Sequence, residues 1–277
     1  MPSETHAAHS MRVGLPMYDP PEMRREVDAW WSGLAAAFRS EGVANVPDRL
    51  DRSVAFDALW SAPDLLFAQA CGYPMIGRWA DRLEYLATPR YAAPGCNGTS
   101  YCSWIVVAAN STASAVEDLR GARCSINSRI SHSGYNALRA LVAPLAEQGG
   151  FFGSVTESGG HLESLRQIER GEADVAAIDC VTHALLSRCH HEVIAATRII
   201  GRTVAAPGLP YVTRAPADSD LIVRLRAGLL RAFADPRLRS VRDALLITGL
   251  DVLPVATYRC MTDMEAEARR CRYFELG

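Results

Sequence analysis

The sequence predicts an α/β protein built on mainly parallel sheets that are flanked by helices. Short apolar runs of strand length, such as "WIVVAA" at 104–109, alternate along the chain with segments of helical apolar spacing. The 277 residues suffice for one large domain or two smaller ones. Because the chain has no linker rich in Pro, Gly or Ser, two lobes would be joined by short hinges.

The expected elements follow one another in an alternating order. The expected strands lie at 11–17, 63–70, 82–88, 100–110, 122–127, 173–179 and 191–200. The expected helices lie at 19–43, 131–145, 159–171, 218–233, 237–249 and 262–274, with a single helical turn at 116–121.

The first helix has the clearest pattern. Asp19 is the expected cap, and two prolines follow it at the first helical positions. Gly42 ends the helix. One face of the helix carries apolar residues at helical spacing, which predicts core packing: Val27, Trp30, Trp31, Leu34 and Phe38.

The stretch "SRISHSGYNALRAL" at 128–141 places Ser131, His132 and Ser133 directly before a helical apolar pattern. Serine is a preferred helix cap, so a purely structural role is one interpretation. The other is an anion cradle, in which backbone N–H groups and small hydroxyls converge on a negatively charged ligand. Pro144 should kink or end this helix.

Composition excludes several classes of protein. A net charge of −2 argues against a nucleic-acid partner, and no apolar run approaches the ~18 residues of a membrane span. Residues 1–21 lack the basic and then apolar pattern of a secretory signal, which predicts a cytoplasmic location, or a periplasmic one if a leader has been removed.

The eight cysteines form no CxxC pair, and we expect them to be reduced. The run "CHH" at 189–191 lies near His183, but no second cluster completes a coordination sphere, so we interpret it as a solvated loop. The sequence therefore predicts neither a metal nor a cofactor.

The ordered motifs "EDLRGARCSIN", "SHSGY", "SGGHLESLRQIERGEADVAAID" and "PGLPYVTR" resemble the phosphonate-binding family of ABC-transporter solute-binding proteins. This resemblance implies the two-lobed, type 2 periplasmic-binding-protein-like fold, with a ligand trapped between the lobes by hinge closure. It implies that residues 11–109 and 204–277 form the first lobe and 110–203 the second, with hinges near 109 and 203.

The resemblance also implies a set of ligand-binding residues. The family's hydroxyl-rich anion cradle falls on Ser131, His132 and Ser133, although the family usually has Thr where His132 stands. The other positions that match are the ligand histidine His161, the acidic residue Asp179, and the first-lobe aromatics Tyr73 and Tyr18. By its chemistry, Asp179 is either a reader of a ligand amine or a structural cap.

Two functions remain open at this stage. The first is a non-catalytic receptor for a phosphonate, phosphate or related oxyanion, either with an ABC permease as its partner or as a soluble sensor. The second is an enzyme on the same scaffold that acts on a small phosphorylated or heterocyclic substrate. No signature such as GxSxG or HExxH supports the enzyme, so we expect a binding protein with no catalytic residues.

Overall fold

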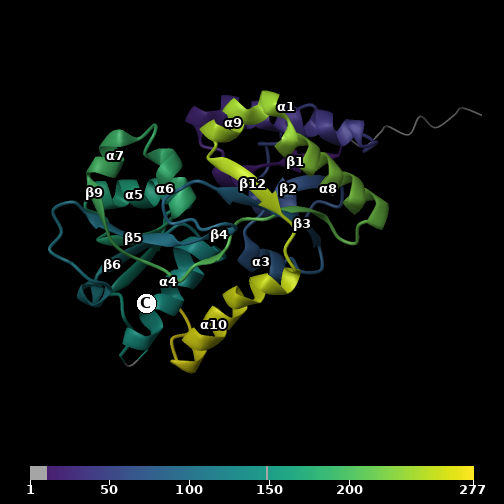
Figure 1. The fold of residues 1–277 in the computed structure, drawn as a ribbon. Coiled ribbons are helices and arrows are strands. Elements are labelled where there is room, and N and C mark those ends of the chain that lie inside the picture. Colours follow the sequence, from purple (N-terminus) through teal and green to yellow (C-terminus); the bar gives the residue numbers. More distant parts are fainter. Residues whose placement is uncertain (1–10, 148) are drawn as a thin grey trace, which may run out of the picture.

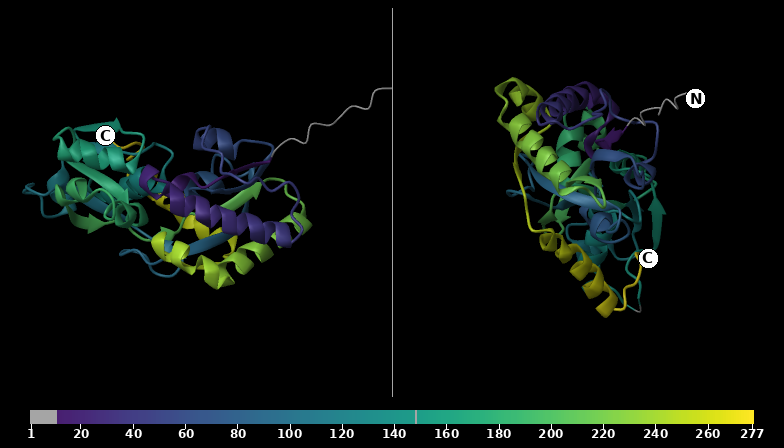
Figure 2. Two further views of the ribbon diagram at one scale, coloured as in Figure 1. Left: turned by 90° about the horizontal axis from the view of Figure 1, so that it is seen from above. Right: turned by 90° about the vertical axis from the view of Figure 1, so that its right-hand side faces the viewer.

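The computed structural model describes residues 11–147 and 149–277. The chain folds into two α/β lobes that lie side by side (Figure 1 and Figure 2). Lobe 1 holds a five-stranded sheet of order β1-β2-β11-β3-β12, and lobe 2 one of order β7-β6-β8-β5-β9. The predicted α/β class of two sheets flanked by helices is confirmed.

Lobe 1 is assembled from both ends of the chain. Its strands are β1 (Arg12–Gly14), β2 (Leu65–Gln69), β3 (Leu83–Tyr91), β11 (Tyr211–Arg214) and β12 (Ile247–Asp251). Its helices are α1 (Arg24–Ser40), α2 (Phe56–Trp60), α3 (Gly72–Ile76), α8 (Ser219–Ala234) and α9 (Arg239–Ala244). Helix α1 packs against α8 and α9 above the sheet.

Lobe 2 is formed by the middle of the chain. Its strands are β5 (Ser103–Ala108), β6 (Arg123–Ile126), β7 (Ser154–Glu157), β8 (Val175–Asp179) and β9 (Thr197–Arg202). Its helical segments include η4 (His132–Asn136), which runs directly into α4 (Ala137–Val142), then α5 (His161–Glu169), α6 (Cys180–Leu186) and α7 (His191–Ala195).

The predicted inward face of α1 is confirmed, because Val27, Trp30, Trp31, Leu34 and Phe38 are all buried. Trp31 stacks on Phe67 of β2, with ring centroids 6.0 Å apart. Full burial of one large apolar side chain contributes about 1.5–3 kcal/mol, so this cluster is a main source of stability in lobe 1.

The lobes are joined by a short two-stranded ladder, in which β4 (Ser100–Tyr101) pairs antiparallel with β10 (Ala206–Pro207). The chain enters lobe 2 at Cys102, because β5 already pairs with β8 and β9. The chain crossing expected near 109 therefore lies at the other end of β5. The apolar run 100–110 hides this break, since the crossing residue Cys102 is itself buried.

The C-terminal segment also departs from the expected lobe boundaries. Helix α10 (Cys260–Arg270) runs from lobe 1 to lobe 2, where the chain ends (Figure 1). Ala268, Tyr273 and Leu276 belong to the core of lobe 2, together with Leu138 and Phe151. Residues 204–277 are thus not confined to lobe 1.

Strand directions differ from the mainly parallel sheets that the sequence favours. Parallel pairing joins β1 to β2 and β6 to β7 and β8, whereas β11, β12, β5 and β9 pair antiparallel to their neighbours. Strand β5 is the first sheet strand after the chain enters lobe 2, and β11 is the first sheet strand after it returns to lobe 1. They therefore run opposite to strands that a helix connects within a lobe.

Three local expectations are corrected. The segment 237–249 ends as strand β12 and not as a helix, and 191–200 begins as helix α7 before it becomes β9. Asp19 is not the N-cap of the long helix: the N-cap of α1 is Met23, and Asp19 follows the short helix η1 (Pro16–Tyr18) as its C-cap. Its carboxylate lies 2.5 Å from the guanidinium of Arg52, and this ion pair replaces the predicted cap.

Candidate ligand-binding site

Ser131, Ser133 and His161 come together at two adjacent helix starts in lobe 2. The Ser133 hydroxyl lies 3.3 Å from Ser131 Oγ and 3.0 Å from His161 Nε2. Ser131 is the N-cap of η4, where its hydroxyl accepts a hydrogen bond from the Gly134 N–H at 3.2 Å. His161 is the first residue of α5, whose N-cap Gly160 supplies no capping side chain.

Glycine at position 134 allows these parts to approach one another. A Cβ atom there would overlap the side-chain oxygen of Asn127, at the end of β6, and would lie 3.3 Å from His161 Cε1. A larger residue would force the Asn127 side chain to move and would crowd the His161 ring. Gly134 therefore allows the close packing of η4 against these two side chains.

His132 lies beside the same serines but faces lobe 1. Its backbone N–H donates to the thiol of Cys71 at 3.4 Å, and its ring lies 6.3 Å from the ring of Tyr73 and 6.3 Å from that of Tyr101. The Asn136 amide donates to His132 Nδ1 at 3.3 Å and to the Met261 carbonyl at 2.8 Å.

This contact fixes the tautomer of His132. Because Nδ1 accepts a hydrogen bond from the Asn136 amide, the hydrogen of the neutral ring resides on Nε2. His132 Nε2 is buried and has no hydrogen-bond partner among the described residues. The ring therefore presents an unused donor between the lobes.

Tyr101 is a further candidate that sequence reasoning missed. Its hydroxyl is buried and, within residues 11–147 and 149–277, makes no hydrogen bond. Burial raises the pKa of Tyr101 well above its usual value, so the group stays a neutral donor. The only sequence signal is a polar aromatic residue in an apolar run, which core packing explains equally well.

Tyr73 reaches the site with its ring, while its hydroxyl is engaged elsewhere. The hydroxyl donates to Glu265 of α10 at 2.7 Å. Burial alone would raise the pKa of Glu265, but the hydrogen bonds from Tyr73 and Arg269 and the nearby Arg139 outweigh it and lower that pKa. Glu265 and Arg139 lie 3.7 Å apart, and this ion pair holds the carboxylate that accepts the Tyr73 hydroxyl.

Asp179 and Tyr18 form a second group that joins the lobes. Asp179 follows β8 and caps α6, because its Oδ1 accepts from the backbone N–H groups of Val181 and Thr182 at 2.8 and 2.9 Å. Tyr18 of lobe 1 donates its hydroxyl to Asp179 Oδ2 at 3.0 Å. Burial raises the pKa of Asp179 to about 6 despite these three donors.

The two histidines of the site are neutral. Burial lowers the pKa of His132 to about 3 and that of His161 to about 4. Desolvation therefore disfavours a positive charge on either imidazole. What remains is a set of neutral donors at a helix start, which suits an anion without a basic surface.

The open groove between the lobes lies away from the predicted ligand-binding residues. A groove of about 450 Å³ is bordered by Pro94 and Leu246 from lobe 1 and by Trp104 and His183 from lobe 2. The predicted residues instead lie where the lobes touch: Ser131, His132, Ser133 and Asp179 are all at most 8% exposed. These four side chains are therefore shielded from solvent in the structure.

Two α/β lobes joined by a short two-stranded ladder are the architecture of the periplasmic-binding-protein-like fold. Residues 15–258 match the family described as the ABC transporter, phosphonate, periplasmic substrate-binding protein. The chain belongs to this family. Its members are periplasmic solute-binding components that bind a small ligand and work with an ABC permease.

Solved structures share the fold at low sequence identity. A binding-protein component of an ABC phosphonate transporter from Pseudomonas aeruginosa is 14% identical, with a TM-score of 0.77 over 95% of this chain and 87% of the other. PhnD1 from Prochlorococcus marinus in complex with methylphosphonate is 12% identical, with a TM-score of 0.73 over 95% and 98%. XAC2383 from Xanthomonas citri bound to chloride ion is 17% identical, with a TM-score of 0.70 over 95% and 98%.

No curated protein matched the chain. In the described part of the chain, no helix combines the length and apolar character needed to cross a membrane. The location predicted from residues 1–21 stays a prediction, and residues 1–10 of that segment lie outside the described residues.

The Ser133–His161 pair has the spacing of a nucleophile and its base. Its chemistry argues against catalysis, because an imidazole with a pKa near 4 is a weak base at neutral pH. His161 Nδ1 also finds no orienting partner among the described residues. The membership of the chain in a solute-binding family agrees with a binding role.

Proposed function

We propose that this protein binds a small phosphonate, phosphate or related oxyanion between its two lobes, as the solute-binding component of an ABC transporter or as a sensor derived from one. The observation that carries the proposal is the Nε2–H of His132, a buried donor with no partner among the described residues. A buried donor left unpaired costs about 1–3 kcal/mol, and a ligand oxygen would recover that energy.

The neighbouring groups suit the same ligand. The Tyr101 hydroxyl is a second free donor beside the His132 ring, and Ser131 and Ser133 add two hydroxyls. A tetrahedral oxyanion accepts several neutral hydrogen bonds at once, and each bond to a charged acceptor contributes about 1.5–3 kcal/mol.

Cys71 occupies the place that the ligand would take at the helix start. Its thiol accepts the His132 N–H at 3.4 Å, and a thiol is a weak acceptor. Burial raises the pKa of Cys71 to about 11, so the sulfur is not a thiolate. We infer that lobe opening releases this contact and that a phosphonate oxygen then replaces the sulfur.

Asp179 sets the preference for an amine on the ligand. A carboxylate offers about four acceptor positions, and Val181, Thr182 and Tyr18 use three of them. We infer that the fourth accepts a ligand ammonium group. Asp179→Asn should then weaken aminoethylphosphonate more than methylphosphonate.

Calorimetric titration tests the proposal with methylphosphonate, aminoethylphosphonate, phosphate and sulfate. Tyr101→Phe and Ser133→Ala should each weaken oxyanion binding by about tenfold to a hundredfold, because each loses a hydrogen bond to a charged acceptor. Tyr101→Phe should leave the melting temperature unchanged, since its hydroxyl has no partner to lose within the described residues.

Tyr91→Phe is the matched control. It removes a hydroxyl that accepts from Gln69 at 3.0 Å within lobe 1, so it should alter stability and leave oxyanion affinity unchanged. If the parent binds none of the panel, the ligand class is wrong and the enzyme on this scaffold becomes the better explanation. If Tyr101→Phe binds like the parent, the placement of the ligand is wrong.

A further inference from the structure

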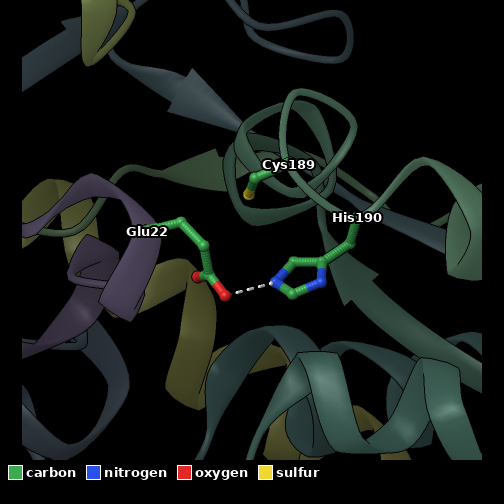
Figure 3. A group of neighbouring side chains, drawn as sticks. All are labelled: Glu22, Cys189 and His190. Carbon is green, nitrogen blue, oxygen red and sulfur yellow. Dashed lines mark ion pairs between the residues drawn. The ribbon is translucent and has the colours of Figure 1, made fainter.

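Glu22, Cys189 and His190 form a cluster outside the candidate ligand-binding site (Figure 3). One oxygen, one sulfur and one nitrogen from these side chains lie within 4.8 Å of one another. His190 Nε2 is 3.2 Å from Glu22 Oε1, yet no described residue forms a well-oriented hydrogen bond with that buried nitrogen. The His190 side chain is only 13% exposed, so the loop is not fully solvated as the sequence suggested.

The cluster draws its ligands from both lobes. Glu22 lies in η2 (Pro21–Met23), where its neighbour Met23 is part of the lobe 1 core. Cys189 and His190 lie between α6 and α7, and Cys189 packs against a core cluster of lobe 2. The sequence alone indicates no further metal ligand near "CHH". The further ligand is Glu22, which lies more than 160 positions away in the chain.

We propose that Glu22, Cys189 and His190 bind a divalent transition metal, with zinc as the type case, and that this metal fastens lobe 1 to lobe 2. Thiolate, imidazole and carboxylate are the three ligand types that zinc uses, with metal–ligand distances of about 2.0–2.3 Å. Tetrahedral ligands at those distances are about 3.3–3.8 Å apart, so small side-chain movements complete the site. Water fills the fourth position.

The thiol selects the class of metal. Sulfur ligands favour zinc and other soft or borderline ions over magnesium and calcium, which prefer oxygen.

A metal shared between the lobes binds the closed arrangement better than an open one. By linkage, it then stabilises closure, and anything else that closes the lobes strengthens metal binding by the same factor. The metal site itself does not depend on the proposed oxyanion. Failure of one proposal leaves the other intact.

The test uses chelator-treated protein without any oxyanion. Zinc is titrated against a chromophoric competitor, and Co²⁺ is added separately to record the near-ultraviolet thiolate-to-metal band. The parent should bind one zinc ion. Its cobalt form should show the thiolate-to-metal band, and the cobalt form of Cys189→Ser should lack it. Glu22→Gln should weaken zinc binding by more than the roughly 10–100-fold typical of a lost outer-shell partner, although it alters only lobe 1.

Two controls isolate the cluster. His191→Ala removes the exposed neighbouring histidine, and Cys260→Ser removes a thiol on α10. Both should retain the zinc affinity of the parent, and melting curves of the metal-free variants confirm that each is folded. Absence of the cobalt band in the parent overturns the site. Zinc affinity in Glu22→Gln equal to that of the parent overturns its role in fastening the lobes.

Discussion

Four features of His132 bear on its role. It is buried, neutral, oriented by Asn136 through Nδ1, and free at Nε2 within the described residues. Such a group costs folding energy and is retained where a ligand compensates for it. Because burial of His132 costs folding free energy, stability measurements can test its state in the folded protein.

The buried His132 predicts a specific pH dependence of stability. Its pKa is about 3 in the folded protein and about 6.5 when unfolded, so the unfolded state binds the proton first as pH falls. Burial of the neutral ring imposes no pH-dependent penalty well above pH 6.5, and the penalty grows as pH falls from there toward 3. Between pH 6.5 and 5, the parent should lose about 1.5 kcal/mol more unfolding free energy than His132→Gln.

Urea denaturation at several pH values measures this difference. His191→Gln serves as the control, because it removes an exposed histidine that lies outside the candidate ligand-binding site. Equal pH slopes for the parent and His132→Gln would show that the pKa of His132 is the same in the folded and unfolded protein, which would contradict a ring that burial keeps neutral.

At the level of residues, the sequence could predict only part of the site. Ser131, His132 and Ser133 are adjacent in the chain and precede a helical pattern, so local rules suffice to single them out. Tyr101 and Glu265 reach the site through chain crossings far away in sequence, which no local pattern encodes. The capping by Asp179 was foreseen as one alternative, and its hydrogen bonds now show it.

Among the elements, β12 shows where periodicity fails. The run "ALLITG" at 244–249 continues the apolar spacing of a helix, yet α9 ends at Ala244 and Leu246 adopts φ 61°. The following residues pair with β3. Sheet pairing decides between two conformations that the apolar pattern permits equally.

The segment after α10 supplies a stability prediction for lobe 2. Tyr273 is fully buried in the lobe 2 core, whereas its neighbour Phe274 is 58% exposed. Tyr273→Ala should lower the unfolding free energy by about 3–5 kcal/mol through cavity formation, as for other large aromatic residues. Phe274→Ala should change it by less than about 0.5 kcal/mol.

Denaturant titration of both variants provides the comparison. A loss for Tyr273→Ala as small as that for Phe274→Ala would mean that the C-terminal segment does not pack on lobe 2. The position of α10 between the lobes would then need revision.

At the scale of the whole molecule, the alternation of strands and helices predicted the fold class, and the motif order predicted the family. The lobe boundaries were less accessible. Cys102 is apolar and buried like the strands on either side of it, so hydrophobicity does not mark the crossing. Hydrophobicity does not mark the crossing of α10 either, because the apolar residues of this helix pack first in the lobe 1 core and then in the lobe 2 core.

A crystal structure of the protein grown with methylphosphonate tests the central claim most directly. We predict the phosphonate between the lobes, with oxygens within hydrogen-bond distance of His132 Nε2, Ser133 Oγ and the Tyr101 hydroxyl, and with Cys71 moved away from the His132 N–H. Phosphonate density in the groove beside Pro94 and His183, or nowhere between the lobes, would contradict the account.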